Sequence, residues 1–348
     1  MTARGGLAER LGKDNEARTK TLVVEVHTND STETLRSLFG ADSVEPTSDA
    51  FLYRARVESG ELWVDQLDER FWSVHTDAPL GQVRRHLHER VQSSRDLDWM
   101  WLPTQHLERV HRHTPAQRIR TNFSGSDLRG AGAPGAGLRL YASGRDAGSL
   151  VDLLERSSEF AGAVALDSVQ IGMDDGTGGV MKEAVDRKGV FLGEGDSFDT
   201  HVQFVRSVVR RYGVFVSLLE AKSIRWEVLP DGGGQLTGSP VGVLFSRPVP
   251  DVARFAENLF TSREPFRLWG SPTVSEGVAE VDAVDLHVGQ RVRIDIGPQW
   301  MRVHLEEGSC GNTVARLISN LQHRFDSRLM LSDPQLQAAL TATAPEQL

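Results

Sequence analysis

The segment from Glu194 to His201 gathers side chains that can bind a divalent metal ion. Glu194, Asp196 and Asp199 offer carboxylate oxygens, and His201 offers an imidazole nitrogen. Donors of this kind are the protein ligands of Mg²⁺, Mn²⁺ and Zn²⁺. One hypothesis for the function is therefore a metal-dependent hydrolase or nuclease that uses this segment.

A structural interpretation competes with that hypothesis. Asp196 or Ser197 can cap a following helix, and Asp199 then lies favourably in the positively polarised first turn. The spacing of the metal-binding residue types matches no known metal motif, so helix capping is the simpler explanation.

The segment 142–148 (ASGRDAG) follows a predicted strand and precedes a predicted helix. A phosphate group can bind at such a helix N-terminus. The segment contains neither GxGxxG nor GxxxxGKS/T, however, and a turn followed by a helix cap explains it better.

The most basic part of the chain carries three histidines and four arginines. These are His106, His111, His113, Arg109, Arg112, Arg118 and Arg120. Their charge suits contact with phosphate groups. A solvated surface, or pairing with the abundant carboxylates, accounts for the same residues.

Cys310 is the single cysteine, so the chain can form no internal disulfide bond. This favours a reducing compartment, and we expect a cytoplasmic protein. Cys310 precedes a predicted helix, where a thiolate is stabilised. No particular histidine can be assigned to it as a base, and GxSxG, HExxH and CxxC motifs are absent. The sequence therefore predicts no catalytic residue and no cofactor.

The bulk composition is that of a globular protein. The 348 residues include 39% hydrophobic and 25% charged residues, and the formal net charge is −9. That charge counts against a dedicated nucleic-acid binder, although a local basic surface stays compatible with it. The polar N-terminus and the absence of a long apolar run predict neither a signal peptide nor a membrane span. Arginine greatly outnumbers lysine, a composition common in GC-rich bacteria.

Breaks rich in glycine and proline divide the chain into three parts of similar size. The predicted divisions are a flexible tail (1–20), a first repeat (21–113), a basic and then glycine-rich linker (114–137), a second repeat (138–229), a third repeat (230–332) and a C-terminal tail (333–348).

Each part shows the same order of hydrophobic periods, β-α-β-β-β-α. The first part has strands at 22–26, 51–57, 61–67 and 71–76, with helices at 32–39 and 80–91. The motif FWSVH at 71–75 matches WMRVH at 300–304, each on the strand before the last helix of its part. The sequence therefore predicts three diverged copies of one α+β unit with antiparallel sheets.

Two helices per unit can cover only one face of a short sheet, so the other face is open or covered by a partner. In the third copy the residues expected to face the helices are Val292, Ile294, Ile296, Met301, Val303 and Leu305. The outer set is Arg291, Arg293, Asp295, Trp300, Arg302 and His304 there, and Arg54, Arg56, Trp63, Asp65, Phe71, Ser73 and His75 in the first copy. Such faces suit contact with a partner, or they pack on each other between copies.

This order of strands and helices resembles the topology of the TATA-binding-protein-like fold, whose copies offer a curved sheet to a ligand. The leading hypothesis is a non-catalytic binding or scaffold protein, a subunit of a bacterial multi-component assembly. Its partner is expected to be another protein or a second copy, with nucleic acid as a further candidate and no membrane contact. The contact residues are expected to be Arg54, Arg56, Trp63, His75, Arg109, Arg112, Arg118, Arg120, Arg291, Arg293, Trp300, Arg302 and His304.

Overall fold

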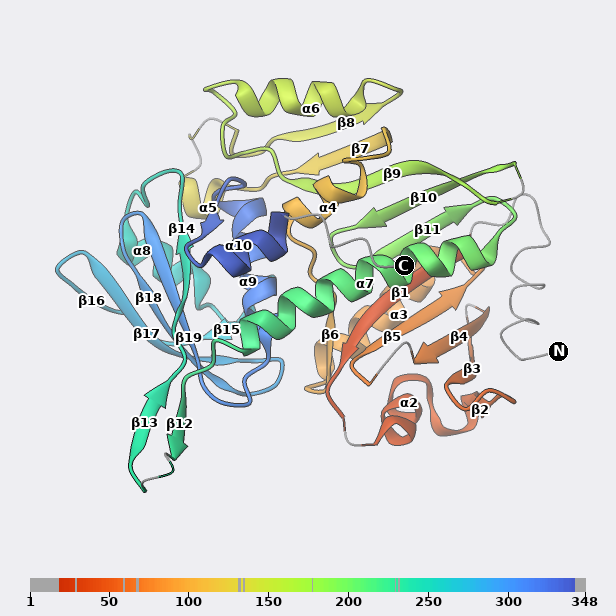
Figure 1. The fold of residues 1–348 in the computed structure, drawn as a ribbon, viewed down its shortest axis with the longest axis horizontal. Helices are drawn as coiled ribbons and strands as arrows, with labels where there is room; N and C mark the ends of the chain where they lie inside the picture. Colours follow the sequence, from red (N-terminus) through yellow and green to blue (C-terminus); the bar gives the residue numbers. More distant parts are fainter. Residues whose placement is uncertain are drawn as a thin grey trace.

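The computed structural model describes residues 19–341, apart from 29, 59, 67–68, 131–132, 134, 177, 229 and 231. Most of the predicted N-terminal tail (1–20) and the end of the predicted C-terminal tail (333–348) lie outside the described residues. The described part is a mixed α+β fold with antiparallel sheets, as the sequence predicts (Figure 1). The likeness to the TATA-binding-protein-like fold is not confirmed.

The first two thirds of the chain share one sheet of 11 strands in the described residues. Its order is β2-β3-β4-β5-β1-β11-β10-β9-β7-β8, and β6 also pairs with β1. The strands are β1 (Thr19–Val26), β2 (Val44–Pro46), β3 (Leu52–Val57), β4 (Gly60–Gln66), β5 (Phe71–Thr76), β6 (Leu97–Trp99), β7 (Ala116–Asn122), β8 (Arg139–Ser143), β9 (Leu166–Asp174), β10 (Val180–Asp186) and β11 (Val190–Glu194).

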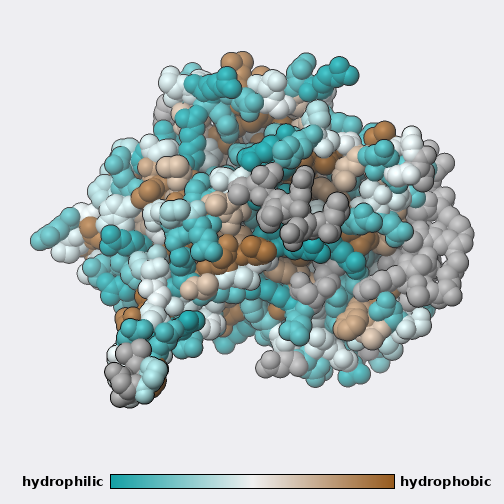
Figure 2. All heavy atoms as spheres, viewed as in Figure 1, coloured by the Kyte–Doolittle hydropathy of each residue, from teal (hydrophilic) through white to brown (hydrophobic). Residues whose placement is uncertain are grey.

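The last third forms a second sheet of seven strands with the order β15-β17-β18-β19-β14-β20, and β16 pairs with β17. A separate two-stranded hairpin, β12–β13, precedes it in the chain and stands clear of the body of the molecule (Figures 1 and 2). These strands are β12 (Arg225–Val228), β13 (Gly234–Thr237), β14 (Val241–Leu244), β15 (Leu268–Trp269), β16 (Thr273–Ser275), β17 (Val278–Asp285), β18 (Arg291–Ile296), β19 (Trp300–Leu305) and β20 (Met330–Leu331).

Side-chain caps fix the start of several helices. Asp30 accepts hydrogen bonds from the backbone N–H groups of Thr32 and Glu33, and Ser197 accepts one from Thr200. The described helices are α2 (Ser31–Phe39), the 3₁₀ turn η1 (Ala41–Ser43), α3 (Leu80–Ser93), α4 (Thr104–Val110), α5 (Ser126–Arg129), α6 (Ala147–Arg156), α7 (Phe198–Glu220), α8 (Val252–Leu259), α9 (Gly311–Arg324) and α10 (Pro334–Thr341).

The first and last thirds share a strand order that the middle third does not follow. β1-β5-β4-β3 corresponds to β14-β19-β18-β17, with the first strand of each part beside its last. In the middle, β8 pairs with β7 instead of β11, and β11 pairs with β1. β7 arises within the predicted linker 114–137, where Ile119 and Thr121 are buried while Arg118 and Arg120 are exposed. The alternation of buried and exposed residues from 116 to 122 indicates a strand. This strand, β7, extends the sheet from β9 to β8, so the first two thirds of the chain form one continuous sheet.

The outer and inner faces of the seven-stranded sheet are as predicted. The inner side chains from Val292 to Leu305 are buried, whereas Arg291, Arg293 and Arg302 are exposed. The first sheet differs, because α7 covers the face opposite α3. Phe71 contacts Tyr212 of α7 with ring centroids 5.8 Å apart. The predicted outer face of the first copy is therefore covered by a helix from the next part of the chain, and not by another copy's sheet.

Helix α9 lies at the centre of the molecule and is buried along residues 311–323. Its apolar side packs on the seven-stranded sheet. Its polar side makes hydrogen bonds to the first two thirds, including Asn312 to the Trp99 carbonyl and Ser319 to the Leu102 carbonyl. The polar surface of this helix thus joins the two sheets. Among its buried groups, Nε2 of His323 has no hydrogen-bond partner in the described residues.

Candidate metal centre

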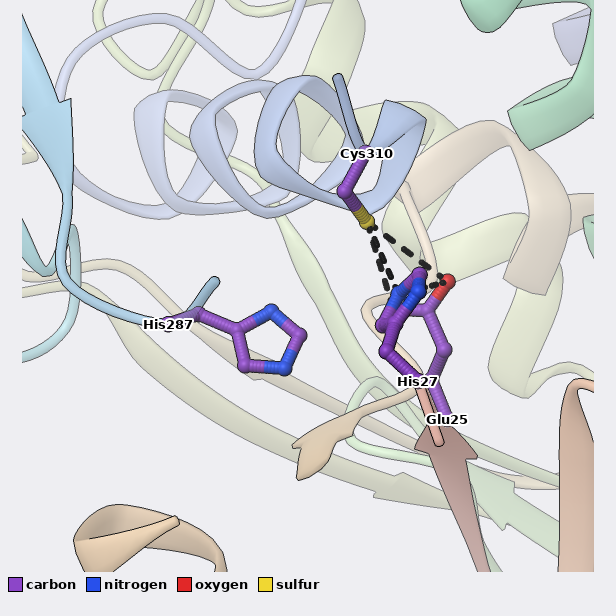
Figure 3. Close-up of side chains that lie close together, drawn as sticks. All are labelled: Glu25, His27, His287 and Cys310. Carbon is purple, nitrogen blue, oxygen red and sulfur yellow. Dashed lines mark hydrogen bonds and ion pairs between the residues drawn. The ribbon is translucent and has the colours of Figure 1, made fainter. Parts of the chain in front are cut away.

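Four side chains from distant parts of the sequence meet where the two sheets join (Figure 3). Glu25 lies near the end of β1 and His27 directly after it. His287 lies in the connection between β17 and β18, and Cys310 is the N-cap residue of α9. Cys310 and His27 are 283 residues apart in the sequence, so the fold alone brings them together.

Three of these side chains form a close triangle. The Cys310 Sγ atom lies 3.2 Å from His27 Nε2 and 3.7 Å from Glu25 Oε2, and His27 Nε2 lies 3.4 Å from Glu25 Oε1. The ligands of a tetrahedral zinc ion are separated by about 3.3–3.6 Å, from bond lengths of about 2.0–2.3 Å. The spacing therefore fits a zinc-class ion between the carboxylate, the imidazole and the thiolate.

His287 lies beside this triangle and offers a second imidazole. One ligand atom of each of the four residues lies within 4.8 Å of the others. The His287 side chain is fully buried, and neither ring nitrogen has a hydrogen-bond partner among the described residues. A buried polar group without a partner is costly. An ion, or a water molecule held beside it, would give one of these nitrogens a partner.

Arg70 holds the carboxylate of Glu25. Its Nε donates to Glu25 Oε1 at 2.5 Å, and its other nitrogens donate to Glu220 at 2.7 and 3.0 Å. Glu220 also accepts a hydrogen bond of 2.8 Å from the backbone N–H of Gly311, at the start of α9. Arg70 and Glu220 therefore orient the Glu25 carboxylate and connect it through hydrogen bonds to the helix that Cys310 caps.

The pKa values of the cluster follow from burial and from Arg70. Burial alone would raise the pKa of Glu25, but the hydrogen bond from His27 and the charge of Arg70 outweigh it and lower the pKa. Burial and the Glu25 carboxylate raise the pKa of the Cys310 thiol well above its usual range. The metal-free protein therefore carries a thiol at this position, and metal binding displaces its proton.

A cysteine nucleophile is the competing chemical interpretation of this cluster. A catalytic dyad needs the orienting carboxylate on the imidazole nitrogen that does not contact the thiol. Here Cys310 and Glu25 both approach Nε2 of His27. The convergence of three donors on one point, together with the protonated thiol, favours metal binding over nucleophilic catalysis.

A cavity of about 760 Å³ opens beside the cluster. His27 and Cys310 line it, together with Arg70, Glu69, Asp96 and Glu307. The His27 side chain is 31% exposed while that of Glu25 is fully buried. The candidate ion site therefore lies at the wall of a cavity that a small molecule can enter.

The predicted metal segment does not bring its four side chains together. Glu194 lies 3.5 Å from Lys182, and Asp196 and Asp199 are exposed. His201 is fully buried, with its Nδ1 2.8 Å from Glu183 and its Nε2 2.7 Å from the hydroxyl of Thr21. The structural interpretation accounts for the segment, because Ser197 caps α7.

The predicted contact residues of the first copy are paired or buried. Arg54 and Arg56 form ion pairs with Glu45. Trp63 is half-buried and packs with Phe198, and His75 is buried beneath α7.

The predicted basic strip separates into two parts. Arg109 is buried and donates to the Ala339 carbonyl, and Arg112 donates to the Thr341 carbonyl. Burial and neighbouring arginines lower the pKa of Arg109 to about 10. Arg118 and Arg120 are exposed on β7.

On the outer face of the seven-stranded sheet, the predicted side chains lie at the surface. Arg293 pairs with Glu280 and Asp295, and His304 lies 2.9 Å from Asp295. Arg302 lies over the ring of Trp300, and Arg291 is exposed.

The sequence holds little signal for the metal centre. Glu25 and His27 share one face of a strand end, His287 lies in a loop and Cys310 is a cap residue. Their spacing matches no motif, and only the pairing of the two sheets with α9 brings them together.

The fold and the cluster define an α+β protein with a candidate metal centre between two antiparallel sheets. A family model described as MJECL33-like protein matches residues 7–339, and the chain belongs to this family. The Uncharacterized protein MJECL33 of the archaeon Methanocaldococcus jannaschii is 23% identical over 357 residues, covering 90% of this chain and 85% of that protein. No solved structure matches the chain. Within the described residues, no helix has the length and apolar character needed to cross a membrane.

Proposed function

We propose that this protein is a metal-dependent hydrolase whose zinc-class ion is held by Glu25, His27 and Cys310. The observation that carries the proposal is the triangle of three different donor atoms, 3.2–3.7 Å apart, at the wall of a cavity. Three protein ligands with one open position are typical of catalytic zinc sites, whereas structural sites are closed. Such an ion supplies Lewis acidity for hydrolysis.

The residues of the chain have separate tasks in this proposal. Arg70 fixes Glu25 and neutralises its charge, so that the carboxylate keeps one orientation. His287 is available to close the site or to hold a water molecule beside it, because neither ring nitrogen has a hydrogen-bond partner among the described residues and the nearest carboxylate, that of Asp98, lies 3.7 Å from Nδ1. The carboxylates of Glu69 and Asp96 line the cavity and are the candidates for proton transfer to a substrate there.

Metal binding is tested by metal analysis of the purified full chain and by calorimetric titration of the chelated protein with Zn²⁺. Cys310→Ser and His27→Ala are expected to weaken binding by more than about 100-fold, because each removes a ligand. His304→Ala is the matched control, since its imidazole lies on the outer face of the other sheet. Co²⁺ should give a thiolate charge-transfer band that Cys310→Ser abolishes. Equal Zn²⁺ affinities in the parent protein and all three variants would overturn the assignment of the metal site.

Hydrolysis is tested with a panel of chromogenic esters, amides and phosphodiesters. Activity that needs Zn²⁺ and disappears in Cys310→Ser supports the proposal. A zinc-loaded protein that hydrolyses none of them would overturn the assignment as a hydrolase and leave the metal site standing.

The second candidate is the non-catalytic binding or scaffold protein, which the β12–β13 hairpin favours. Trp226, Val228 and Leu236 are 63, 77 and 69% exposed. Trp226 is paired with Leu236 across the hairpin, so these apolar side chains share one face. A protein partner or a second copy would cover that face.

Light scattering over a range of concentrations tests self-association. A dimer that Trp226→Ser dissociates supports a second copy, and a monomer at every concentration rejects it. A cytoplasmic location is part of both proposals, because a chain with one cysteine does not depend on an oxidising compartment.

A further inference from the structure

A second cavity, of about 590 Å³, is lined by cations and uncharged polar groups of β7, β8, β9 and β10. Arg118, Arg145 and Lys182 line it, together with the amides of Gln117 and Gln170 and the hydroxyl of Ser143. None of its lining residues in the described part of the chain carries a carboxylate. An acid-free cavity is unusual in a chain whose formal net charge is −9.

The strand register builds this cavity. Arg118 on β7 is directly opposite Gln170 on β9 and directly opposite Ser143 on β8. Directly opposed residues point to the same side of a sheet, so these three side chains form a row across neighbouring strands. Lys182 lies one step along, opposite Gly172, whose lack of a side chain makes room for the amide of Gln117, since a Cβ there would lie 2.5 Å from Gln117 Nε2.

Gln170 offers an amide to a ligand in this row. The residue as a whole is only 7% exposed, and it lies among those that line the cavity. Its amide atoms are not among the enclosed polar atoms that lack a partner, so they are open to the cavity. An amide in this position can donate to, or accept from, a polar ligand.

The charge of the cavity is only partly neutralised. Lys182 lies 3.5 Å from Glu194. Arg118 and Arg145 are exposed, and neither forms an ion pair within the part of the chain that the structure describes. Two guanidinium groups beside an amide and a hydroxyl form a donor set for a group with several acceptor oxygens.

We propose that this cavity binds a phosphate group, with Arg118 and Arg145 as the charged donors and Gln170 and Ser143 as the neutral ones. The volume suits a mononucleotide-sized ligand. The phosphate comes either from a free phosphorylated small molecule or from the backbone of a single-stranded nucleic acid. Arg120 and the 59% exposed Tyr141 lie opposite each other on the same face and extend it beyond the cavity.

The test is calorimetric titration of the full chain with inorganic phosphate, AMP and a short single-stranded oligonucleotide. Sodium chloride at equal ionic strength is the control for screening. Arg118→Gln is expected to weaken binding by about tenfold or more, because it removes a charge-assisted contact. Gln170→Leu should weaken it while the protein stays folded. Arg291→Gln is the matched control, an exposed arginine on the outer face of the other sheet.

Binding of AMP that is lost in Arg118→Gln and kept in Arg291→Gln supports the site for a small molecule. The same pattern with the oligonucleotide alone supports a nucleic-acid strand. If Arg118→Gln does not fold, Arg145→Gln takes its place, because that arginine lies in an exposed turn. Binding of no phosphate probe, or equal losses in Arg118→Gln and Arg291→Gln, would overturn the proposal. The result is independent of the metal centre, since none of these variants touches a metal ligand.

Discussion

Arg316 on α9 forms an ion pair with Asp98 on β6, and both side chains are excluded from solvent. The same guanidinium binds Asp285 at the end of β17, so one cation joins the two sheets. Asp285 in turn accepts a hydrogen bond of 3.1 Å from the backbone N–H of His287. Burial lowers the pKa of Arg316, but the two carboxylates outweigh it and raise the pKa overall. The ion triad therefore holds His287 in place beside the candidate metal centre.

Arg316→Met is expected to destabilise the protein by about 3–5 kcal/mol, because it leaves two buried carboxylates without a countercharge. Arg302→Met is the matched control, since Arg302 is exposed on β19 and lies over Trp300. Urea unfolding followed by fluorescence measures both variants. Similar losses of unfolding free energy in Arg316→Met and Arg302→Met would show that the buried triad stabilises the protein no more than an exposed arginine does.

The pH dependence of stability should contain a contribution from Glu108 on α4. Burial and the nearby Glu155 raise the pKa of Glu108 from 4.5 to about 7, against the opposing charge of Arg112, while Asp152 adds to the rise. A carboxyl whose pKa is raised in the folded state favours folding while it is protonated. This contribution is fully present below the unfolded pKa and is lost as the pH rises through about 7.

Glu108→Gln is therefore expected to be more stable than the parent protein at pH 8, by something on the order of 1–3 kcal/mol. Near pH 4 the two should be alike. Urea unfolding at both pH values provides the measurement, and Glu257→Gln on the exposed side of α8 is the control. A Glu108→Gln advantage that stays constant with pH would contradict the assignment.

The sequence predicts local structure well where one face of an element is buried. On β18 and β19 the alternation from Arg291 to Leu305 separates the exposed from the buried side chains correctly. Periodicity reports that a face is buried and does not report which element covers it. For this reason the sequence predicts that the helices of each third cover only their own sheet, whereas Tyr212 and Phe198 of α7 also cover Phe71 and His75 of the first third.

The candidate metal centre cannot be predicted from the sequence, for a related reason. The local sequence predicts an ordinary strand around Glu25 and His27. It predicts a helix cap at Cys310 and does not indicate which histidine lies beside the thiol. Their meeting depends on long-range packing of β1 against the start of α9, which leaves no local pattern in the sequence.

A buried chain of hydrogen bonds links the first and second thirds, and Gly193 is the residue that makes room for it. The chain runs through Ser73, His75, Thr21, His201 and Glu183, with contacts of 2.7–3.0 Å. A Cβ atom on Gly193 would lie 2.6 Å from Nδ1 of His201. A contact that short forces the imidazole away from Glu183.

Gly193→Ala should therefore lower the thermal midpoint, because it leaves buried polar groups without partners. Gly81→Ala in α3 is the control, since a Cβ there meets no atom within 4 Å. The control is expected to gain about 0.5 kcal/mol from the higher helix propensity of alanine. Equal midpoints for the two variants would show that the chain tolerates a displaced His201.

Arg70→Gln tests whether Glu25 depends on a countercharge that a metal ion can replace. Glu25 is fully buried, and Arg70 supplies a positive charge 2.5 Å from its carboxylate. Without that charge and without metal, the protein is expected to lose about 3–5 kcal/mol of stability.

A divalent ion bound by Glu25, His27 and Cys310 brings its own positive charge to the same carboxylate. The thermal midpoint should therefore rise further on adding Zn²⁺ in Arg70→Gln than in the parent protein, and chelation should reverse both increases. In the double variant Arg70→Gln with Cys310→Ser the increase should vanish, because the ion has lost its sulfur ligand. An Arg70→Gln protein whose thermal midpoint does not respond to Zn²⁺ would show that no ion binds beside Glu25.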